Sequence, residues 1–444
     1  MLHAQTSHRR KLVEFLQATE NEIAIDTIAF GLAGRRPGEA GFFPRPAKWI
    51  NGVGRWRWVY RLAWRVAAIL WRGGGAALFF LYELVRLWRS SKVPGDDSAL
   101  LSPNGYFLGL SSRAGDLVRP PAIEDVPACW LTLPWAPVQE PPEGCRRFDM
   151  LRLLSAADLW DCYRLAVSAT RALAKGKNAP WVLQTYTALR WFAVRAALEK
   201  LRGRFVMAEH FDRWAVLVDS VVRANKRGRS RTDRQDCPLV LVQHGEVGGL
   251  SPEAWRSEFY ATLRRKLGSV TMLYAFDMES ATIFRTSLLT PACAETVQVR
   301  FYKPRISLRP VPKTDRCRVL FVGHPHCEAL HVHLLGVLSS EYALDVRYKP
   351  HPLAAMSPAM SRHEWQIVTD KTGFPEADLL ISYPSTLVTE YSAWNIPAVV
   401  HPLDQEVASS QELLERIRRE LDSIMGQGRR TTPVSRAQLS GGAK

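Results

Sequence analysis

Histidines, a lysine and hydroxyl residues follow three short apolar segments in the last third of the chain. These segments end in Gly323-His324-Pro325-His326, in Lys349-Pro350-His351-Pro352 and in Tyr383-Pro384-Ser385-Thr386. Lysine and histidine could supply positive charge to a phosphate. Hydroxyl groups ahead of a helix can bind a phosphate together with the first backbone N–H groups. We therefore expect a phosphate group of a ligand to be bound by His324, Lys349, His351, Ser385 and Thr386.

Each of these assignments has a structural alternative. Ser385 or Thr386 could simply cap the helix that begins there. His351, held extended by the proline after it, could be a structural histidine. Glu390, one turn into the helix, could accept hydrogen bonds from a ribose or sugar hydroxyl, or could be an ordinary surface acid.

A second group of residues that could take part in catalysis lies in the first half of the chain. Gln243-His244-Gly245 closes the apolar segment PLVLV, and the glycines near His244 would let a ligand approach the backbone closely. The cluster Glu209-His210-x-Asp212-Arg213 follows the apolar segment RFVMA. Any of His244, Glu209 and Asp212 could act as a general base. Capping of the next helix is the alternative for the two acids.

The residues of each group can act together only if the strands before them end side by side. The hydrophobic pattern predicts such strands. Short apolar segments alternate with helical ones, which is typical of a parallel α/β sheet with helices on both faces. In such sheets the ligand lies beyond the carboxyl ends of the strands, so the polar ends should converge on one edge. The predicted strands are residues 204–208, 238–242, 318–322, 344–348, 366–368, 379–382 and 398–401, and the predicted helices are residues 149–174, 181–201, 210–225, 328–338, 386–394 and 410–425.

Several enzyme classes lack their sequence signatures here. The chain contains no G-x-x-x-x-G-K-[ST] loop, no G-x-G-x-x-G after a strand, no D-x-D and no G-x-S-x-G. These absences argue against a P-loop kinase or ATPase and a nicotinamide dehydrogenase, and they weaken a chelated-metal nucleotide site. The seven cysteines form no C-x-x-C pair, so neither a disulfide framework nor a metal site is expected.

The formal charge of +16 is concentrated at the two ends of the 444-residue chain. Residues 1–95 carry a net +9 and residues 426–444 carry +4, which leaves +3 for the part between them. The body of the protein is therefore nearly neutral. The tail 426–444 has few apolar residues and is expected to be disordered.

Residues 55–89 combine five tryptophans with seven arginines. On a helix, four arginines from Arg57 to Arg72 share one face, an aliphatic stripe from Leu62 to Leu70 lies on another, and Trp64 and Trp71 border the arginines. The longest charge-free stretch is ten residues, Gly73–Tyr82, whereas a membrane-spanning helix needs roughly 20 apolar residues.

We therefore expect an amphipathic helix that lies in the plane of an anionic membrane surface, with a second short helix after the glycines 73–75. Packing on the protein's own core is the alternative, and binding of single-stranded nucleic acid is a weaker one. Acidic residues interrupt the first 30 residues, so no secretory signal is expected. The predicted location is cytoplasmic, peripheral on the inner face of the membrane.

The order of the motifs resembles that of bacterial GT-B type glycosyltransferases. The resemblance covers roughly residues 200–405 and rests on a strand followed by QHG and a glycine-rich loop, then KPHP, then LLISYPSTLVTEYSAWNIPAVVH. The similar enzymes build capsule and lipopolysaccharide and include polysialyltransferase-like and CDP-glycerol transferase-like groups. The resemblance implies nucleotide contact at His351 and Pro352, phosphate contact at Ser385 and Thr386, and a catalytic or acceptor-side role near His244, with Glu209 or Asp212 as base.

The predicted fold is α/β, with two Rossmann-like domains after a membrane-associating region. Residues 1–95 form that region, residues 96–310 the acceptor domain and residues 311–425 the nucleotide-binding domain. The expected function is metal-independent transfer of a sugar from a CMP- or UDP-linked donor, a substrate rather than a cofactor, to a growing or lipid-linked surface polysaccharide. The alternatives are a sugar-nucleotide epimerase of the same fold, a CDP-glycerol-type phosphotransferase and a non-catalytic scaffold on a bilayer.

Overall fold

The chain divides into two compact units, Met1–Arg305 and Ile306–Lys444. This boundary lies close to the predicted one between residues 310 and 311. The predicted residues 1–95 do not form a unit of their own. The coordinates are a computed structural model, which describes residues 2–32, 35–46, 49–50, 53, 56–90, 105–109, 129–136, 145–227, 238–247, 263–304, 306–312, 314–351, 356–370 and 373–427.

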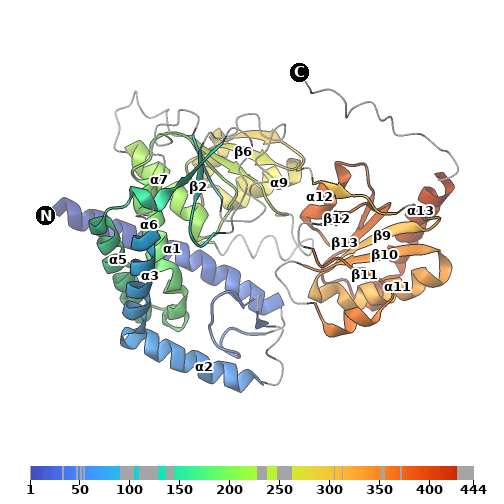
Figure 1. Cartoon of the computed structure of the whole chain (residues 1–444), viewed down its shortest axis with the longest axis horizontal. Helices are drawn as coiled ribbons and strands as arrows, with labels where there is room; N and C mark the ends of the chain where they lie inside the picture. The colour runs from blue at the N-terminus through green and yellow to red at the C-terminus, as the bar shows by residue number, and fades with distance from the viewer. Residues whose placement is uncertain are drawn as a thin grey trace. The chain divides into compact units, whose positions relative to one another are not determined.

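The first unit is built on a parallel sheet (Figure 1). Among the described residues its strand order is β3-β2-β1-β4-β5-β6-β7, and every neighbouring pair is parallel. Strands that run outward in two directions from β1 define a doubly wound, Rossmann-like sheet. The strands are β1 Tyr106–Leu108, β2 Cys129–Thr132, β3 Arg146–Asp149, β4 Phe205–Met207, β5 Leu239–Val242, β6 Val270–Ala275 and β7 Gln298–Phe301.

This sheet is buried on both faces. Because side chains alternate along a strand, Phe205 and Met207 join one apolar cluster while Val206 joins another. A strand that is apolar on both faces suits a sheet covered by helices on both sides. The two buried strands predicted in the first half of the chain are present as β4 and β5.

Helical segments lie between the strands of this sheet along the chain. Helix α5 begins with a capping box, in which Ser155 and Asp158 exchange hydrogen bonds between side chain and backbone. Besides residues 57–90, the helical segments described in this unit are α1 Leu2–Leu32, η6 Met150–Leu153, α5 Ala156–Lys175, η7 Ala179–Thr187, α6 Ala188–Leu198, α7 Arg213–Arg227, α9 Met278–Ile283, η9 Phe284–Leu288 and α10 Pro291–Thr296.

Helix α1 belongs to the core of the first unit. Phe15 and Ala18 are fully buried, and Glu14 pairs with Arg195 of α6, whose side chain is only 1% exposed. Arg195 also donates to Glu199 at 3.0 Å. A buried arginine must keep its charged partners, so these contacts fix α1 to the body and explain why residues 1–95 are not a separate region.

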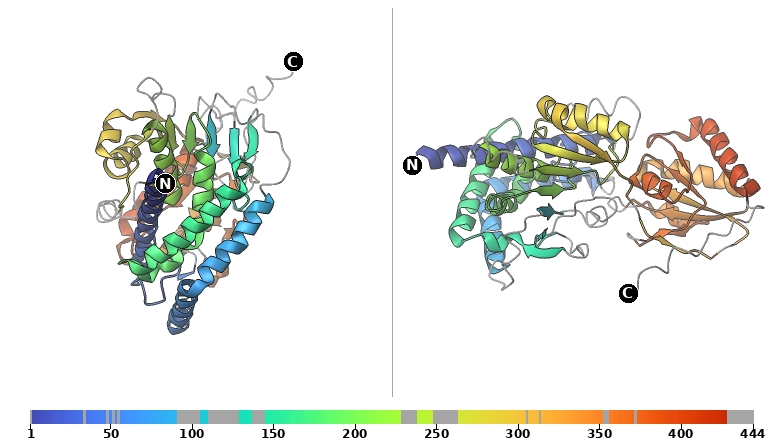
Figure 2. Two further views of the ribbon diagram at one scale, coloured as in Figure 1. Left: turned by 90° about the vertical axis from the view of Figure 1, so that its left-hand side faces the viewer. Right: turned by 90° about the horizontal axis from the view of Figure 1, so that it is seen from above.

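The Trp/Arg-rich segment forms one kinked helical element along the outside of the first unit (Figure 2). It comprises α2 Arg57–Leu70, the wide turn η4 Trp71–Gly75 and α3 Ala76–Ser90. Gly74 has φ 118°, which a residue with a side chain rarely adopts, so the glycines kink the helix instead of ending it.

By length and composition this 34-residue helix could cross a membrane, and 22% of its most apolar stretch is buried. The length expected from the sequence included only the charge-free residues 73–82, whereas the helix of the structure continues on both sides of them.

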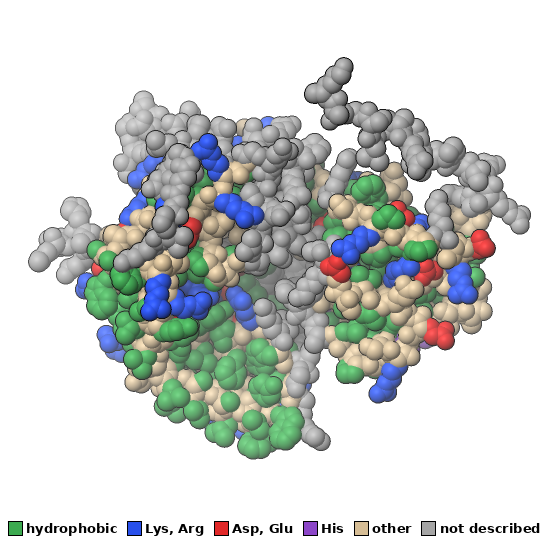
Figure 3. All heavy atoms as spheres, in the orientation of Figure 1, with side chains coloured by type: hydrophobic (Ala, Val, Ile, Leu, Met, Phe, Trp, Pro, Cys, Tyr) green, Lys and Arg blue, Asp and Glu red, His purple; other side chains and the backbone are tan. Residues whose placement is uncertain are grey.

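The apolar face of this helical element points away from the body. Leu62, Ile69 and Leu78 are 53%, 68% and 71% exposed, and Figure 3 shows hydrophobic side chains gathered over α2. The tryptophans predicted to border the arginines face inward instead. Trp64 packs against Phe42, and Trp71 donates to Thr185 Oγ1 at 2.9 Å. The exposed aromatic residues are Trp56, Trp58, Tyr82 and Trp88.

The second unit repeats the doubly wound plan. Its main sheet, as far as the structure describes it, has the order β11-β10-β9-β13-β14 and is parallel throughout, and β12 pairs with β8. The strands are β8 Leu308–Arg309, β9 Cys317–Val322, β10 Leu344–Lys349, β11 Gln366–Ile367, β12 Phe374–Pro375, β13 Leu379–Ser382 and β14 Ala398–Val400, and the helical segments are η10 Pro325–Cys327, α11 Glu328–Glu341, η11 Pro358–Arg362, α12 Thr386–Ser392, η12 Val407–Ser409 and α13 Gln411–Gln427.

The predicted fold class is confirmed. Each unit has a Rossmann-like parallel sheet, and the two together are the pair of sheets that a GT-B chain contains. The five strands and three helices predicted after residue 315 are all present. The predicted disordered tail lies almost entirely outside the described residues.

Candidate active site

Three aromatic side chains meet at the carboxyl edge of the sheet in the second unit. The strand order reverses between β9 and β13, and a ligand binds such a sheet at that switch point. His324 follows β9 and Tyr383 follows β13, with ring centroids 5.5 Å apart. His351, just after β10, lies 5.2 Å from His324. The convergence predicted for these strand ends is therefore present.

The turn after β9 holds His324 in place. Nδ1 of His324 accepts a hydrogen bond from the backbone N–H of His326 at 3.3 Å. Gly323 leads into the turn against Tyr348, and a Cβ at this position would lie 2.1 Å from that ring. Only glycine allows this close approach, so Gly323 helps to set the position of His324.

These histidines are neutral near pH 7. Burial, together with His351 and His326, lowers the pKa of His324 to about 3. Burial also lowers the pKa of His351. The rings can therefore donate or accept single hydrogen bonds at a phosphate or a base, but they do not act as the cations that the sequence analysis expected.

Lys349 has a structural role in the second unit. Its side chain is buried, and Nζ donates to the backbone oxygens of Asp370 and Gly373, each at 2.9 Å. The ammonium also lies 4.9 Å from the centroid of the Phe374 ring. The prediction that Lys349 supplies charge to a phosphate is not supported, because these contacts hold its charge inside the unit.

The remaining predicted contacts lie in and near α12, and the structure places them differently. Ser385 caps α12, and its hydroxyl accepts from the backbone N–H of Leu387 at 3.4 Å. Thr386, the first residue of the helix, is half-buried. Glu390 is fully buried, so it is not the ordinary surface acid of the alternative. Ser385 and Thr386 stay at the edge, whereas Pro352 lies outside the described residues.

The first unit has its own cluster at the switch point between β1 and β4. Glu209 and His210 follow β4 and are both buried, and His244 follows β5. The ring centroids of His210 and His244 lie 4.3 Å apart. Two of the predicted catalytic residues, Glu209 and His244, are thus brought to one edge together with His210.

Backbone contacts set the tautomers of these two histidines. The N–H of His244 donates to Nε2 of His210 at 3.0 Å, so Nε2 of His210 carries a lone pair. Nδ1 of His244 contacts the carbonyl oxygen of Ala208, and a carbonyl can only accept. Nδ1 of His244 therefore carries the proton and Nε2 is its basic nitrogen. Burial and His244 lower the pKa of His210.

Asp212 caps the next helix, the structural alternative for this residue. Its Oδ1 accepts from the backbone N–H groups of Trp214 and Ala215, both at 2.9 Å. Burial and then Glu22 raise its pKa to about 7. Arg213 is tied to α1, because its backbone N–H donates to Glu22 at 3.0 Å. The contacts of Asp212 and Arg213 are therefore explained by their structural roles, without a catalytic one.

Gln243 locks the loop that carries His244. Its Oε1 accepts from the N–H of Phe276 at 2.8 Å, and its Nε2 donates to the oxygen of Gly245 at 3.0 Å. The hydroxyl of Tyr302 donates to the carbonyl oxygen of Gln243. A loop held at both ends in this way keeps the ring of His244 at the edge of the sheet.

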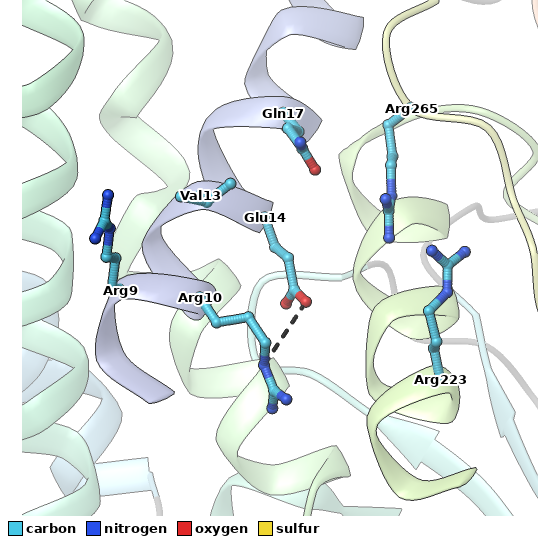
Figure 4. A pocket seen from close by; sticks show the side chains of 7 residues that line it. All are labelled: Arg9, Arg10, Val13, Glu14, Gln17, Arg223 and Arg265. Atoms are coloured by element: carbon cyan, nitrogen blue, oxygen red, sulfur yellow. Dashed lines mark ion pairs between the residues drawn. The ribbon is translucent and has the colours of Figure 1, made fainter. Parts of the chain in front are cut away.

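An arginine-lined cavity of about 400 Å³ lies elsewhere in the first unit (Figure 4). Arg9 and Arg10 of α1 meet Arg223 of α7 and Arg265 there, and Arg10 pairs with Glu14 at 3.9 Å. Arg223 contacts Asp219, which binds the N–H of Gly268 just before β6 begins. The cavity therefore lies toward the amino edge of the sheet, away from the candidate site.

Two residues of the candidate site were not singled out as site residues in the sequence analysis. His210 directly follows β4, as Glu209 does, and Tyr383 directly follows β13. The sequence did show that both residues follow predicted strands. It could not show which residue of each turn points to the carboxyl edge of the sheet, because the alternation of side chains holds only within a strand.

No family model and no curated protein matches this chain. Among solved structures, the wall teichoic acid polymerase TagF is similar over 78% of this chain and 88% of its own, with 10% identity and a TM-score of 0.34. A UDP-N-acetylglucosamine 2-epimerase from Rickettsia bellii is similar over 55% of this chain and 80% of its own, with 14% identity and a TM-score of 0.29.

Proposed function

We propose that this protein is a glycosyltransferase that moves a sugar from a nucleotide-sugar donor to a saccharide acceptor at a membrane surface. The observation that carries the proposal is the clustering of polar side chains at both topological switch points. One cluster offers a basic imidazole nitrogen, on His244, and the other offers neutral donors and hydroxyls, on His324, His351 and Ser385.

The first unit supplies the base in this proposal. Nε2 of His244 removes the proton from the acceptor hydroxyl, because Nδ1 is already protonated and held by Ala208. The acceptor oxygen then forms a bond to the anomeric carbon. The bond from that carbon to the phosphate oxygen of the donor breaks, and its electron pair stays on the phosphate.

The second unit holds the leaving nucleotide. His324 and His351 lie at the switch point with rings 5.2 Å apart, where each can donate one hydrogen bond to a phosphate oxygen or to the base. Ser385 and Thr386 add hydroxyl groups at the end of β13. Because Lys349 is held by the backbone oxygens of Asp370 and Gly373, hydrogen bonds from these neutral groups stabilise the phosphate.

The exposed helical element supplies the membrane contact. Helix α3 is fixed to the body on one side, since Glu83 is 3% exposed and pairs with Arg190 of α6. Its other side presents Leu78, Leu81 and Val85 to the outside. A helix packed along one side suits an orientation in the plane of the membrane, with arginines at the level of anionic headgroups.

Thermal melting of the full chain with CMP, CDP, UDP and GDP tests the nucleotide site. We expect one nucleotide to raise the melting temperature, and its effect to be lost in His351→Ala but kept in the control His363→Ala. The absence of any shift would contradict the nucleotide site. Incubation with the sugar-nucleotide alone then tests the epimerase, which would form product without an acceptor. Release of CMP together with transfer of glycerol phosphate would favour the phosphotransferase.

Flotation with vesicles tests the membrane contact. We expect binding to vesicles that contain anionic lipid, and its loss when Leu62, Ile69 and Leu78 are all replaced by Ser. A matched triple replacement of exposed residues elsewhere, Val13, Met278 and Met425, should leave binding unchanged. Resistance to extraction by alkaline carbonate would instead show that the helix spans the bilayer.

A further inference from the structure

Cys327, His331 and His401 form a buried cluster beneath the histidine edge of the second unit. Cys327 and His331 are fully buried and His401 is 1% exposed. Cys327 precedes α11 and His331 lies one turn into that helix, so their side chains share a face. His401 follows β14, and its Nε2 lies 2.9 Å from Nε2 of His331. One ligand atom from each residue lies within 4.8 Å of the other two.

The groups around the cluster orient its ligand atoms. Nδ1 of His401 lies 2.7 Å from the carbonyl oxygen of Pro402. Because a carbonyl only accepts, Nδ1 of His401 carries the proton and Nε2 presents its lone pair to His331. A histidine held by a backbone carbonyl through its other nitrogen is the usual outer-shell arrangement of a metal ligand. Sγ of Cys327 lies 3.9 Å from Nδ1 of His331.

We propose that Cys327, His331 and His401 bind a zinc ion. One thiolate and two imidazoles are ligands that zinc prefers, and a tetrahedral zinc site separates neighbouring ligand atoms by roughly 3.3–3.6 Å. The two Nε2 atoms, 2.9 Å apart, are already slightly closer than this. The thiol lies within 4.8 Å of them, so it has to approach by at most about 1.5 Å. The fourth position is open to water or to the carbonyl oxygen of His324, which lies 3.2 Å from Cys327 Sγ.

Binding changes the protonation of the cluster in a defined way. Without metal, a proton lies between the two Nε2 atoms of His331 and His401. Zinc takes its place, the proton of His331 moves to Nδ1, and the thiol of Cys327 loses its proton to solvent. One proton is released for each ion bound, and the net charge of the cluster becomes +1.

The ion would stabilise the turn that carries the candidate nucleotide contacts. Cys327 lies three residues after His324 and is joined to its carbonyl oxygen. The ring of His331 packs against Phe321 of β9, with centroids 5.2 Å apart. Zinc would thus tie α11, β14 and the turn after β9 together. This role is structural and does not depend on the reaction proposed above.

A redox or nucleophilic role for Cys327 does not suit the same geometry. The thiol is fully buried, and burial raises its pKa, whereas reactive cysteines are partly exposed thiolates. The two imidazoles beside Cys327 are therefore better explained as ligands.

Metal analysis of the full chain, purified without a polyhistidine tag or chelator, tests the proposal. We expect about one zinc per chain. After removal of zinc by a chelator, Co²⁺ should give the absorption band of a thiolate–cobalt bond, and Cys327→Ser should abolish that band. His401→Gln should weaken binding at least about 10-fold. The matched controls are His333→Gln on the same helix and Cys317→Ser in β9, which should bind as the natural chain does.

A natural chain that holds no zinc after growth with zinc and gives no cobalt–thiolate band would overturn the proposal. An unchanged cobalt spectrum in Cys327→Ser would do the same. If Cys327→Ser does not fold, His401→Gln supplies the test, read as zinc affinity in a competition with a chromophoric chelator. None of these measurements uses a donor or an acceptor, so their outcome is independent of the glycosyltransferase assay.

Discussion

The strands at the switch point of the first unit end in Glu209 and His210, with His244 beside them, whereas those of the second unit end in His324 and Tyr383, with His351 nearby. Both sheets run outward in two directions from a central strand. The first edge combines an acid with a histidine whose basic nitrogen is defined by a backbone contact. The second edge combines neutral histidines with hydroxyl groups. The same architecture therefore places an acid and an imidazole with a defined basic nitrogen at one edge, and neutral histidines with hydroxyl groups at the other.

Burial shifts the pKa of titratable groups in both units, upward for carboxyls and downward for histidines. In the first unit, burial raises the pKa of Asp26 and of Asp212 to about 7. In the second unit, burial lowers the pKa of His324 to about 3 and also lowers that of His351. Desolvation favours the neutral form in every case, so the sign of the shift follows from the residue type.

The largest effect is expected for His244, whose replacement should lower the rate of transfer without changing nucleotide binding. His244→Gln should reduce the rate of transfer about 10²–10⁴-fold, because glutamine cannot accept the proton of the acceptor. The melting shift caused by the nucleotide should be unchanged. The measurement is the single-turnover rate together with nucleotide melting. A loss of nucleotide binding with an unchanged rate would reverse the roles assigned to the two units.

The reciprocal change concerns His351 in the second unit. His351→Ala should weaken nucleotide binding roughly 10-fold, as expected when one hydrogen bond to a charged group is lost. The rate at saturating donor should change little. Calorimetric titration of the nucleotide measures the effect, with His363→Ala as the control. Equal affinities of the His351 variant and the natural chain would remove His351 from the site.

Acidification should destabilise the second unit. A histidine with a lowered pKa in the fold contributes stability that is fully present above its unfolded pKa near 6.5 and is lost as the pH falls. For His324, which faces His326, His351 and Tyr383, the loss between pH 6.5 and 5 is roughly 1–2 kcal/mol. Hydrogen exchange, corrected for intrinsic rates, should show falling protection of β9 and β13 over this range.

The carboxyls of the first unit whose pKa is raised have the opposite effect on stability when the pH falls. Asp26 and Asp212 bind protons in the fold that they release in the unfolded chain between about pH 4 and 7. Their contribution therefore favours folding at the acid end of this window and fades as the pH rises. Protection of α1 and α7 should fall less than that of β9 and β13 on acidification, and an equal fall would contradict the comparison.

The smallest effect distinguishes a cap from a base at Asp212. Asp212→Ala should cost about 1 kcal/mol of unfolding free energy, whereas Asp212→Asn should keep the cap and most of the stability. Both variants should retain transfer activity, measured beside a denaturant titration. Loss of transfer in Asp212→Asn with normal stability would make Asp212 the catalytic base.

Much of the fold could be predicted because it depends on local patterns. The alternation of short apolar segments with helices located β9, β10, β13 and β14 within a residue or two. The polar ends of these strands located the edge where a ligand binds. What failed was the direction of single side chains. Lys349 turns into the unit, Glu390 is buried, and Trp64 and Trp71 face the body, because strand position and helical angle do not say which side a neighbouring element covers.

Residue types and their spacing were enough to predict the parallel sheets, the ends of their strands and the amphipathic character of residues 55–89. Three other features became visible only in the folded chain: α1 belongs to the first unit, Asp212 caps a helix, and His331 meets His401 across 70 residues. The physical reason is that a side chain's charge, tautomer and role depend on burial and on the atoms it contacts. Those contacts join segments that are far apart in the chain.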